Sequence, residues 1–290
     1  MATRPSGVGI GLRRRHFDEL PRCERELDFL ELCPENFVGA GALRGGRDRR
    51  VLDACIERWP ILAHGVSMSL GGPDPLDRGY IRALKGLLDR LDAPFYTDHL
   101  CFVSVGGRSS QDLLPIPFCE AAVHHCARRI RALADQLERP VAVENISYYA
   151  QMPVPGGAGM GEGEFVRAVV EEADCLLLLD VNNIYVNAVN HDEDASESLR
   201  SLPVERSCQI HLAGHVREGP RLIDHHGAPV CDAVWALYRE ALALAGPIPT
   251  LIEWDTAVPA LDVVLDEADR ARAIWREVRA ARSAAAEASA

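Results

Sequence analysis

Eight short apolar segments recur along this chain, and seven of them contain or adjoin a His, Asp, Glu or Asn side chain that can bind a metal ion. The segments span residues 8–12, 29–33, 61–64, 95–99, 141–145, 176–180, 209–212 and 251–254. Each has the length and the apolar character of a buried strand. A chain with eight such strands separated by helices can close into a parallel barrel.

Segments with helical periodicity lie between the apolar ones, at residues 49–59, 77–91, 118–137, 164–172, 232–245 and 260–281. A further helix is expected at residues 19–27. The alternation predicts the α/β fold class, with one (β/α)8 TIM barrel over residues 1–281 and a frayed or disordered tail at 282–290. Two long connections, at 101–115 and 213–230, are expected to wall the mouth of the barrel. Gly106-Gly107 is the expected tip of a hairpin.

Charge and cysteine content exclude several classes of protein. Lys and Arg number 31 against 43 Asp and Glu, and a net charge of −12 disfavours nucleic-acid binding. The nine cysteines form no CxxC pair, which argues against a disulfide framework, an Fe–S cluster and a structural zinc site. No apolar run approaches the roughly 20 residues that cross a bilayer, and none precedes the first strand. We therefore expect a cytoplasmic protein that does not bind membranes.

Six of the polar side chains stand at the ends of different predicted strands. In a parallel barrel the carboxyl ends of all strands meet at one mouth, so residues far apart in sequence share a pocket. Taken singly, a histidine in a strand is more often a hydrogen-bonded core residue than a metal ligand. Buried carboxylates, however, cost several kcal/mol each unless they are paired or bound to metal. The six expected ligands are His64, His99, Glu144, Asp180, His211 and Glu253.

Three more residues are expected to join this site. In the segment 222–226, a strand-like alternation places Asp224 and His226 on one side and His225 on the other. Asn183 is the third candidate, whereas Asn145 and Asn182 can equally serve as helix N-caps. The site offers more donors than one ion can use, and the carboxylate of Glu144 can bridge two ions. These features predict two or three metals.

Other polar residues near the strand ends are expected to assist rather than bind metal. Asp98 lies beside His99 and is expected to orient an imidazole ring. Asp98 and His215 are also the candidates for proton transfer, although the sequence does not choose between them. Cys33 and Cys101 end strands at the mouth and are expected to be buried, unreactive thiols.

These segments together resemble the multinuclear non-haem iron family of the methanobactin-biosynthesis oxidase, also called domain of unknown function 692 or UPF0276. The resemblance covers nearly the whole chain and all eight predicted strands. It is carried by Gly7–Arg13, Glu31–Phe37, His64–Ser67, Thr97–Cys101, Glu144–Ser147, Leu179–Asn183, His211–His215, Ile223–His226 and Ile252–Trp254.

The resemblance implies a xylose-isomerase-like barrel that binds two or three irons, cycling between Fe²⁺ and Fe³⁺. It also implies the use of O₂ to modify cysteine in a ribosomally made precursor peptide, with a small partner protein that recognises the leader of that peptide. Glu35, Asn36 and Asn145 would then contact substrate or support the ligands. The implied irons would bind, first, His64, His99 and Glu144; second, Glu144, Asp180, His211 and Glu253; third, Asn183, Asp224 and His226.

The same barrel carries other activities, so fold alone does not decide the function. One alternative is a zinc- or manganese-dependent sugar isomerase or a phosphodiesterase-type hydrolase. Another is a non-enzymatic iron-binding protein that acts only through a partner. Metal content and O₂ consumption separate these alternatives from the oxidase.

Overall fold

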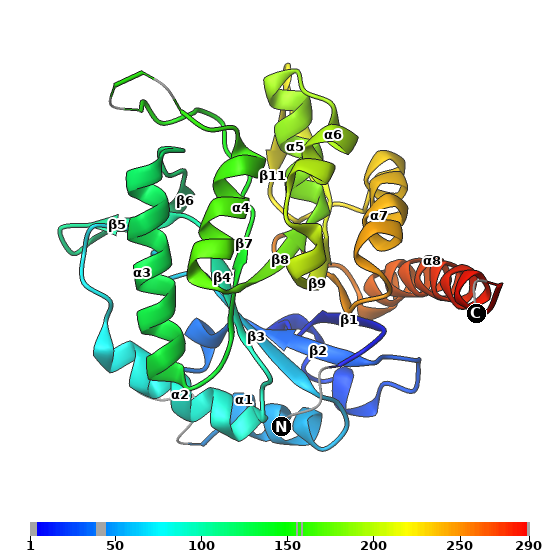
Figure 1. Ribbon diagram of the computed structural model, residues 1–290. Helices are drawn as coiled ribbons and strands as arrows, with labels where there is room; N and C mark the ends of the chain where they lie inside the picture. The colour runs from blue at the N-terminus through cyan, green and yellow to red at the C-terminus, as the bar shows by residue number, and fades with distance from the viewer. Residues whose placement is uncertain (1–4, 39–44, 155, 158, 289–290) are drawn as a thin grey trace.

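A closed barrel of eight parallel strands forms the centre of the computed structural model, which describes residues 5–38, 45–154, 156–157 and 159–288 (Figure 1). Around the barrel the order is β1, β12, β9, β8, β7, β4, β3, β2. These strands are β1 (Val8–Gly11), β2 (Phe29–Leu32), β3 (Ile61–Gly65), β4 (Tyr96–His99), β7 (Val141–Glu144), β8 (Leu176–Asp180), β9 (Ser207–Leu212) and β12 (Thr250–Ile252). Each overlaps one of the eight apolar segments, which confirms the expected fold class.

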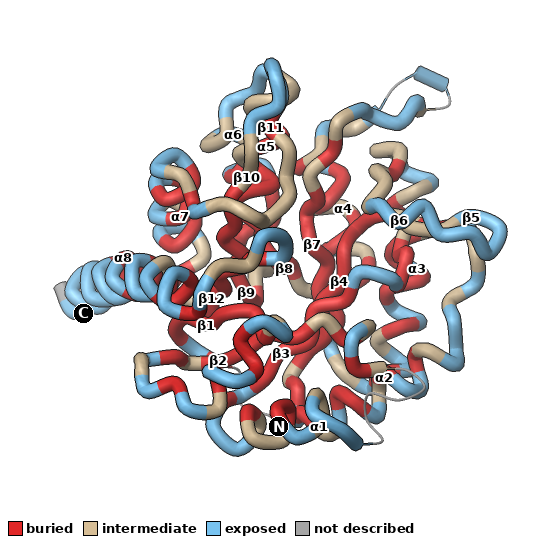
Figure 2. The backbone as a smooth tube through the Cα atoms, turned by 180° about the vertical axis from the view of Figure 1, so that it is seen from behind, coloured by how far each residue is buried: buried red, intermediate tan, exposed pale blue. Residues whose placement is uncertain are grey.

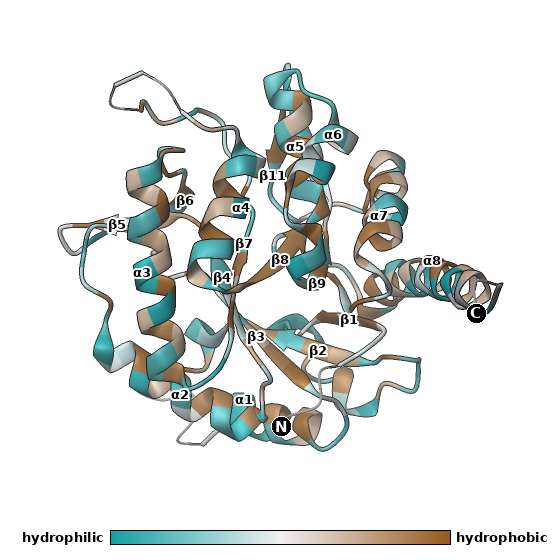
Figure 3. Cartoon of the chain, in the orientation of Figure 1, coloured by the Kyte–Doolittle hydropathy of each residue, from teal (hydrophilic) through white to brown (hydrophobic). Residues whose placement is uncertain are grey.

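The strands are apolar because both of their faces are covered. Leu177, Leu178 and Leu179 of β8, for example, are all fully buried. Figure 2 shows the barrel strands as a continuous buried centre, and Figure 3 shows them mostly hydrophobic, with mixed hydropathy along the surrounding helices. Side chains inside the barrel and side chains under the helices both avoid water, so the near-continuous apolar pattern follows from the parallel topology.

Helices surround the barrel and follow its strands in chain order. They are α1 (Arg47–Ile56), α2 (Arg78–Leu91), α3 (Glu120–Leu137), α4 (Glu162–Ala173), α5 (Val181–His191), α6 (Ala195–Ser201), α7 (Asp232–Ala245) and α8 (Leu261–Ala288). Among the described residues, no helix combines the length and the apolar character needed to span a bilayer.

The expected helix at residues 19–27 is wrong. The connection from β1 to β2 instead contains two 3₁₀-helices, Arg14–His16 and Leu20–Arg22. Pro21 has no backbone N–H and fits only the start of a helix, so a single short turn forms around it. Two further 3₁₀-helices occur at Pro34–Asn36 and Val204–Arg206.

Two helices were not expected from the sequence, α5 and α6. The α5 segment contains four Asn and three Val residues, which are weak helix formers. Its start is stabilised by Asp180, whose carboxylate accepts a hydrogen bond of 2.6 Å from the Asn183 backbone N–H. At the other end of the chain, α8 continues to Ala288 and therefore takes in most of the segment expected to be a frayed tail. Residues 289–290 of that segment lie outside the described residues.

Two antiparallel hairpins extend from the barrel, one in each of the long connections. The first consists of β5 (Phe102–Val105) and β6 (Arg108–Leu114), the second of β10 (His215–Glu218) and β11 (Arg221–Asp224). Gly106 and Gly107 form the tip of the first hairpin with φ of 60° and 71°, as expected. Both positive angles suit glycine, since it lacks the Cβ that would clash there.

Candidate metal centre

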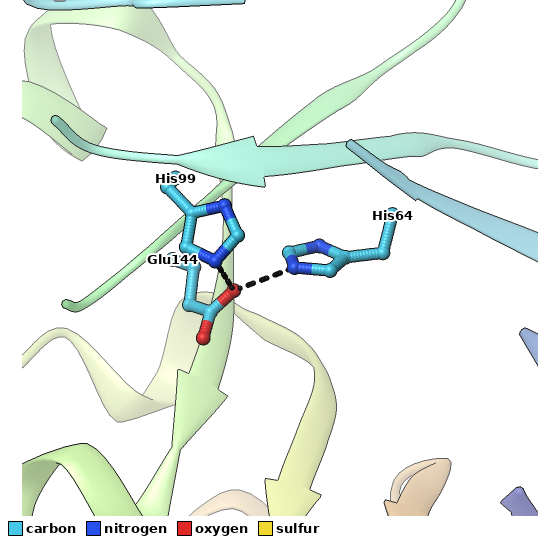
Figure 4. A group of neighbouring side chains, drawn as sticks. All are labelled: His64, His99 and Glu144. Atoms are coloured by element: carbon cyan, nitrogen blue, oxygen red, sulfur yellow. Dashed lines mark ion pairs between the residues drawn. The ribbon is translucent and has the colours of Figure 1, made fainter. Parts of the chain in front are cut away.

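His64, His99 and Glu144 meet at the carboxyl ends of three neighbouring barrel strands, β3, β4 and β7 (Figure 4). The Nε2 atoms of His64 and His99 lie 3.0 and 3.2 Å from the same carboxylate oxygen, Glu144 Oε2. Parallel pairing of β4 with β7 places His99 opposite Glu144 and so contributes directly to this arrangement. All three side chains are buried.

Hydrogen bonds on the far side of both imidazole rings orient their Nε2 atoms. His99 Nδ1 lies 3.0 Å from the Gly65 carbonyl oxygen, which can only accept, so Nδ1 carries the proton. Thr97 Oγ1 donates to the Ala63 carbonyl and lies 2.9 Å from His64 Nδ1, which is therefore the donor of that contact. Nε2 of each ring is then the atom that faces Glu144 and that a cation placed there could bind. This is the outer-shell arrangement of metal-binding histidines.

A second group of donors continues from Glu144 across β8, β9 and β12. His211 Nδ1 lies 3.0 Å from Glu253 Oε2, and the His211 ring stands edge-on to that of His64 at 5.0 Å. Asp180 and His211 are opposite each other in the pairing of β8 with β9. Four triplets have donor atoms within 4.8 Å of one another: His64, His99 and Glu144; His64, His211 and Glu253; Glu144, Asp180 and His211; and Asp180, His226 and Glu253.

Asn183, Asp224 and His226 lie beside this group, although Asp224 is in none of the four triplets found among the described residues. His226 Nε2 lies 2.7 Å from Asp224 Oδ1, and its Nδ1 lies 3.3 Å from Glu253 Oε2. The strand β11 ends at Asp224, and His226 has a left-handed backbone with φ of 48°. Asp224 and His226 thus approach each other, but a turn causes this and not the strand alternation that the sequence suggested.

Four of the expected ligands have a buried polar atom without a hydrogen-bond partner. These atoms are Glu144 Oε2, Asp180 Oδ2, Asn183 Oδ1 and His226 Nε2. Burial, reinforced by the neighbouring charge of Glu144, raises the pKa of the Asp180 carboxyl well above its usual value. Glu144 Oε2 and His226 Nε2 do lie within ion-pair distance of His64, His99 and Asp224. Buried polar atoms that lack a hydrogen bond are costly, and a divalent cation among them would remove the cost. The residues therefore fit a site for metal ions.

The residues expected to support the site occupy different positions. Asp98 accepts hydrogen bonds from the Tyr96 hydroxyl and from the His99 backbone N–H. It does not orient an imidazole, contrary to expectation, because adjacent strand residues face opposite sides and the His99 ring contacts Gly65 instead. His215 Nδ1 lies 2.8 Å from Asn182 Oδ1.

Glu35, Asn36 and Asn145, which were expected to contact substrate or support the ligands, differ in their contacts and exposure. Glu35 Oε1 accepts from the backbone N–H groups of Val66 and Ser67, in the loop that follows His64. Asn145 exchanges two hydrogen bonds with the backbone of Asp180, at 2.9 and 3.0 Å, and so joins β7 to β8 rather than capping a helix. Asn36 is exposed.

Sequence reasoning missed two residues of the site, Glu31 and Arg13. Glu31 is buried inside the barrel, and its carboxylate lies 3.1 Å from His211 Nε2. A charged residue within the apolar segment 29–33 was the available signal. Arg13 forms ion pairs with Glu253 and Asp255, the second of which also contacts His226.

A cavity of about 470 Å³ opens beside the candidate metal ligands. Its lining includes Val66 and Val103, and the hairpin strand β6 contributes Gln111 and Leu113. Seven of the nine expected ligands also line it, with His225 beside them: His64, His99, Glu144, Asn183, Asp224, His226 and Glu253. Most of the expected ligands therefore face a pocket large enough for several side chains of a bound molecule, whereas Asp180 and His211 are not among its lining residues.

Comparison with known proteins identifies close relatives over nearly the full length of the chain. The family described as RiPP precursor modification enzyme MbnB/TglH/ChrH matches residues 7–276. A UPF0276 protein of Pseudomonas aeruginosa is 46% identical over 273 residues, covering 93% of both chains. A UPF0276 protein of Caulobacter vibrioides is 45% identical over 270 residues, covering 93% of this chain and 94% of the relative.

Solved structures with the same fold are much more distant in sequence. D-psicose 3-epimerase from Clostridium cellulolyticum H10 superposes with a TM-score of 0.56 at 12% identity, covering 94% of this chain and 99% of the other. A xylose isomerase domain protein from Alicyclobacillus acidocaldarius gives a TM-score of 0.56 at 16% identity, covering 95% and 98%. These likenesses establish the xylose-isomerase-like barrel and say nothing of the reaction.

Proposed function

The chain belongs to the family of RiPP precursor modification enzymes MbnB/TglH/ChrH, and from this premise we propose that it uses two or three bound irons and O₂ to oxidise cysteine in a ribosomally made peptide. The observation that carries the proposal is the convergence of buried imidazole and carboxylate groups from separate barrel elements into four donor triplets beside one cavity. Imidazole mixed with carboxylate and amide oxygen suits iron, manganese and zinc. The absence of cysteine from the four donor triplets of the described residues favours a non-haem site over an Fe–S cluster.

The side chains divide into groups that could each hold one ion. His64, His99 and Glu144 would hold the first, and Asp180, His211 and Glu253, with Glu144 shared, the second. Asn183, Asp224 and His226 would hold the third. Glu144 is the residue common to the first two groups, since it belongs to one donor triplet with His64 and His99 and to another with Asp180 and His211. A shared carboxylate keeps neighbouring ions close enough to act together.

Bound ferrous iron would supply electrons for O₂ reduction and an open position for a substrate thiolate. The residues of the chain would bind the metal ions and the substrate and would orient the ligand atoms. Thr97 and the Gly65 carbonyl keep the protons of His64 and His99 on Nδ1, away from the cavity. Val66, Val103 and Leu113 give the cavity an apolar side that limits the access of water to the reacting cysteine.

The substrate proposed for this cavity is a cysteine-containing segment of a precursor peptide. A volume of about 470 Å³ accommodates a few residues, so the rest of the peptide must be held elsewhere. We assign that task to a small partner protein that recognises the leader. His215, half-buried and hydrogen-bonded to Asn182, is the proposed proton carrier near the mouth, with Asp98 as the second candidate behind the site.

The test is anaerobic reconstitution of the purified chain with Fe²⁺, followed by measurement of iron content and O₂ uptake. We expect two or more irons per chain and O₂ uptake that requires a Cys-containing precursor peptide, with no uptake for the Cys→Ser peptide. His64→Ala should abolish uptake, whereas His124→Ala, which changes an exposed side chain on α3, should not.

Three results would contradict the proposal. Tight zinc binding with phosphodiester hydrolysis would indicate a hydrolase, and epimerisation of a keto-sugar with Mn²⁺ would indicate a sugar enzyme. Iron binding without O₂ uptake, in the presence of both peptide and partner, would indicate an iron-binding protein without this activity.

A further inference from the structure

Glu31 lies inside the barrel beneath the candidate metal ligands. Its side chain is 3% exposed, and that of His211 is 0% exposed. The His211 ring lies between two carboxylates, because Nε2 is 3.1 Å from Glu31 Oε1 and Nδ1 is 3.0 Å from Glu253 Oε2. Glu31 itself is held from the other side by Gln209, whose Nε2 donates to Glu31 Oε2 at 2.6 Å.

These contacts, together with the donor triplets, indicate which nitrogen of His211 would keep its proton when a metal binds. His211 Nε2 faces both oxygens of Glu31, at 3.1 and 3.3 Å, and Nδ1 faces Glu253. An N–H toward either carboxylate forms a charge-assisted hydrogen bond. Glu253 belongs with His211 to a donor triplet, whereas Glu31 belongs to none of the triplets found among the described residues. A metal bound in that triplet would therefore replace a proton on Nδ1 and leave the proton on Nε2.

Placing the proton on Nε2 leaves Nδ1 as the atom available for a metal. His211 Nδ1 is on the side of Glu253, which belongs with His64 and His211 to one of the donor triplets. His64 and His99 have the opposite arrangement, with Nδ1 hydrogen-bonded and Nε2 toward the site. Three histidines of one centre thus present two different ring nitrogens.

We propose that Glu31 is a positioning residue that forms a carboxylate–imidazole–metal triad with His211, so that His211 binds metal through Nδ1. Gln209 fixes the Glu31 carboxylate in this role. The inference rests on the metal centre of the proposed function, adds a residue that the donor triplets do not contain, and assigns the ring nitrogen through which His211 binds. Removal of such an outer partner typically weakens metal affinity by about 10–100-fold.

The experiment uses the full chain labelled with ¹⁵N-histidine and loaded with Zn²⁺ as a diamagnetic probe. NMR then reports, for each ring, which nitrogen is protonated and which is bound to metal. In the wild-type chain we expect His211 with a protonated Nε2 and a metal-bound Nδ1. Zinc titration of Glu31→Gln should show at least one site weakened about tenfold or more.

A swap and a matched control separate positioning from packing. In the double variant Glu31→Gln with Gln209→Glu, a carboxylate again lies near His211 Nε2, because the Gln209 side chain is 3.1 Å from that atom. The double variant should recover the Nε2–H signal and most of the lost affinity. Glu35→Gln alters a carboxylate in the 3₁₀-helix just after β2 that contacts Cys33 and Val66, and it should leave the His211 signals in place.

The possible outcomes distinguish this inference from the proposed function. A wild-type chain that binds neither zinc nor iron in the cavity contradicts both. Metal binding with His211 coordinated through Nε2, or with Glu31→Gln equal to wild type in affinity, overturns the role of Glu31 alone. If Glu31→Gln does not fold, the double variant and the wild-type ring signals still decide the question.

Discussion

At Glu144, a single carboxylate oxygen faces two imidazole nitrogens and has no hydrogen bond. Such an atom is unfavourable in a buried site unless a cation shares it with its neighbours. The role of Glu144 as a candidate ligand could be predicted from the sequence because this residue ends an apolar segment. Glu31 could not, because it lies within such a segment, and only the closed barrel shows that its side chain reaches His211.

Replacing Glu144 tests whether it bridges. Glu144→Ala removes a carboxylate common to two donor triplets, so we expect the loss of more than one metal per chain. Elemental analysis of the anaerobically loaded protein measures this directly. Loss of a single metal would show that Glu144 serves one ion only.

The adjacent histidines His225 and His226 provide a second test at the residue scale. His226 contacts Asp224 and Glu253, whereas His225 Nδ1 accepts a weak hydrogen bond from the Gly227 backbone N–H. We expect His226→Ala to lower the metal content by about one ion per chain. The neighbouring change His225→Ala should leave the metal content intact, and equal effects of the two changes would refute the assignment.

At the scale of elements, the end of β3 packs closely against two side chains of β4. A Cβ built on Gly65, at the end of β3, would lie 1.8 Å from the Tyr96 hydroxyl oxygen and 2.5 Å from Asp98 Oδ2. The same glycine supplies the carbonyl that accepts from His99. Close packing behind the end of β3 therefore helps to hold His99, a candidate ligand, in place.

Gly65→Ala should lower the free energy of unfolding by about 1–3 kcal/mol, because the added methyl group displaces Tyr96 and Asp98. Urea denaturation measures the change. The matched control is Gly86→Ala in α2, where a Cβ meets nothing within 4 Å and helix propensity rises by up to about 1 kcal/mol. A stabilising effect of Gly65→Ala would contradict the close packing.

A half-buried carboxyl links α4 and α5 outside the candidate metal centre. Glu162, the first residue of α4, accepts hydrogen bonds of 3.3 and 3.4 Å from Asn187 of α5. Burial raises its pKa to about 7, although contacts with Tyr148 and Asn187 oppose the shift. The folded protein therefore holds this proton more tightly than the unfolded chain, whose pKa is near 4.5.

The stability contributed by the Glu162 proton is complete below pH 4.5 and is lost as the pH rises to about 7. Relative to Glu162→Gln, the wild-type chain should lose on the order of 2 kcal/mol of stability across that window and then level off. Urea denaturation of both metal-free proteins at several pH values gives the difference. A difference that does not change with pH would contradict the raised pKa.

Helix prediction succeeded where periodicity was strong and failed where local composition opposed it. The segment expected for α7 has the same bounds as the helix. The sequence did not predict α5, because its Asn and Val residues favour other structures. Packing and the Asp180 cap stabilise this helix. The segment 19–27 shows the reverse, since a helical pattern was present but Pro21 limited it to one 3₁₀ turn.

At the scale of the whole molecule, the parallel barrel explains why the site could be predicted without coordinates. Every strand ends at the same mouth, so polar residues that follow apolar segments must converge. The topology does not specify register, ring orientation or the turn at His226. These features depend on pairings such as Asp180 with His211 and on local backbone angles, which the sequence pattern does not reveal.

The most direct test of the metal centre is anomalous X-ray diffraction at the iron edge from crystals of the anaerobically loaded protein. We expect two or three iron peaks at the base of the cavity, one of them bonded to the Nε2 atoms of His64 and His99 and to Glu144. Iron located elsewhere on the molecule, or a cavity in which Glu144 and Asp180 contact no metal, would contradict the account.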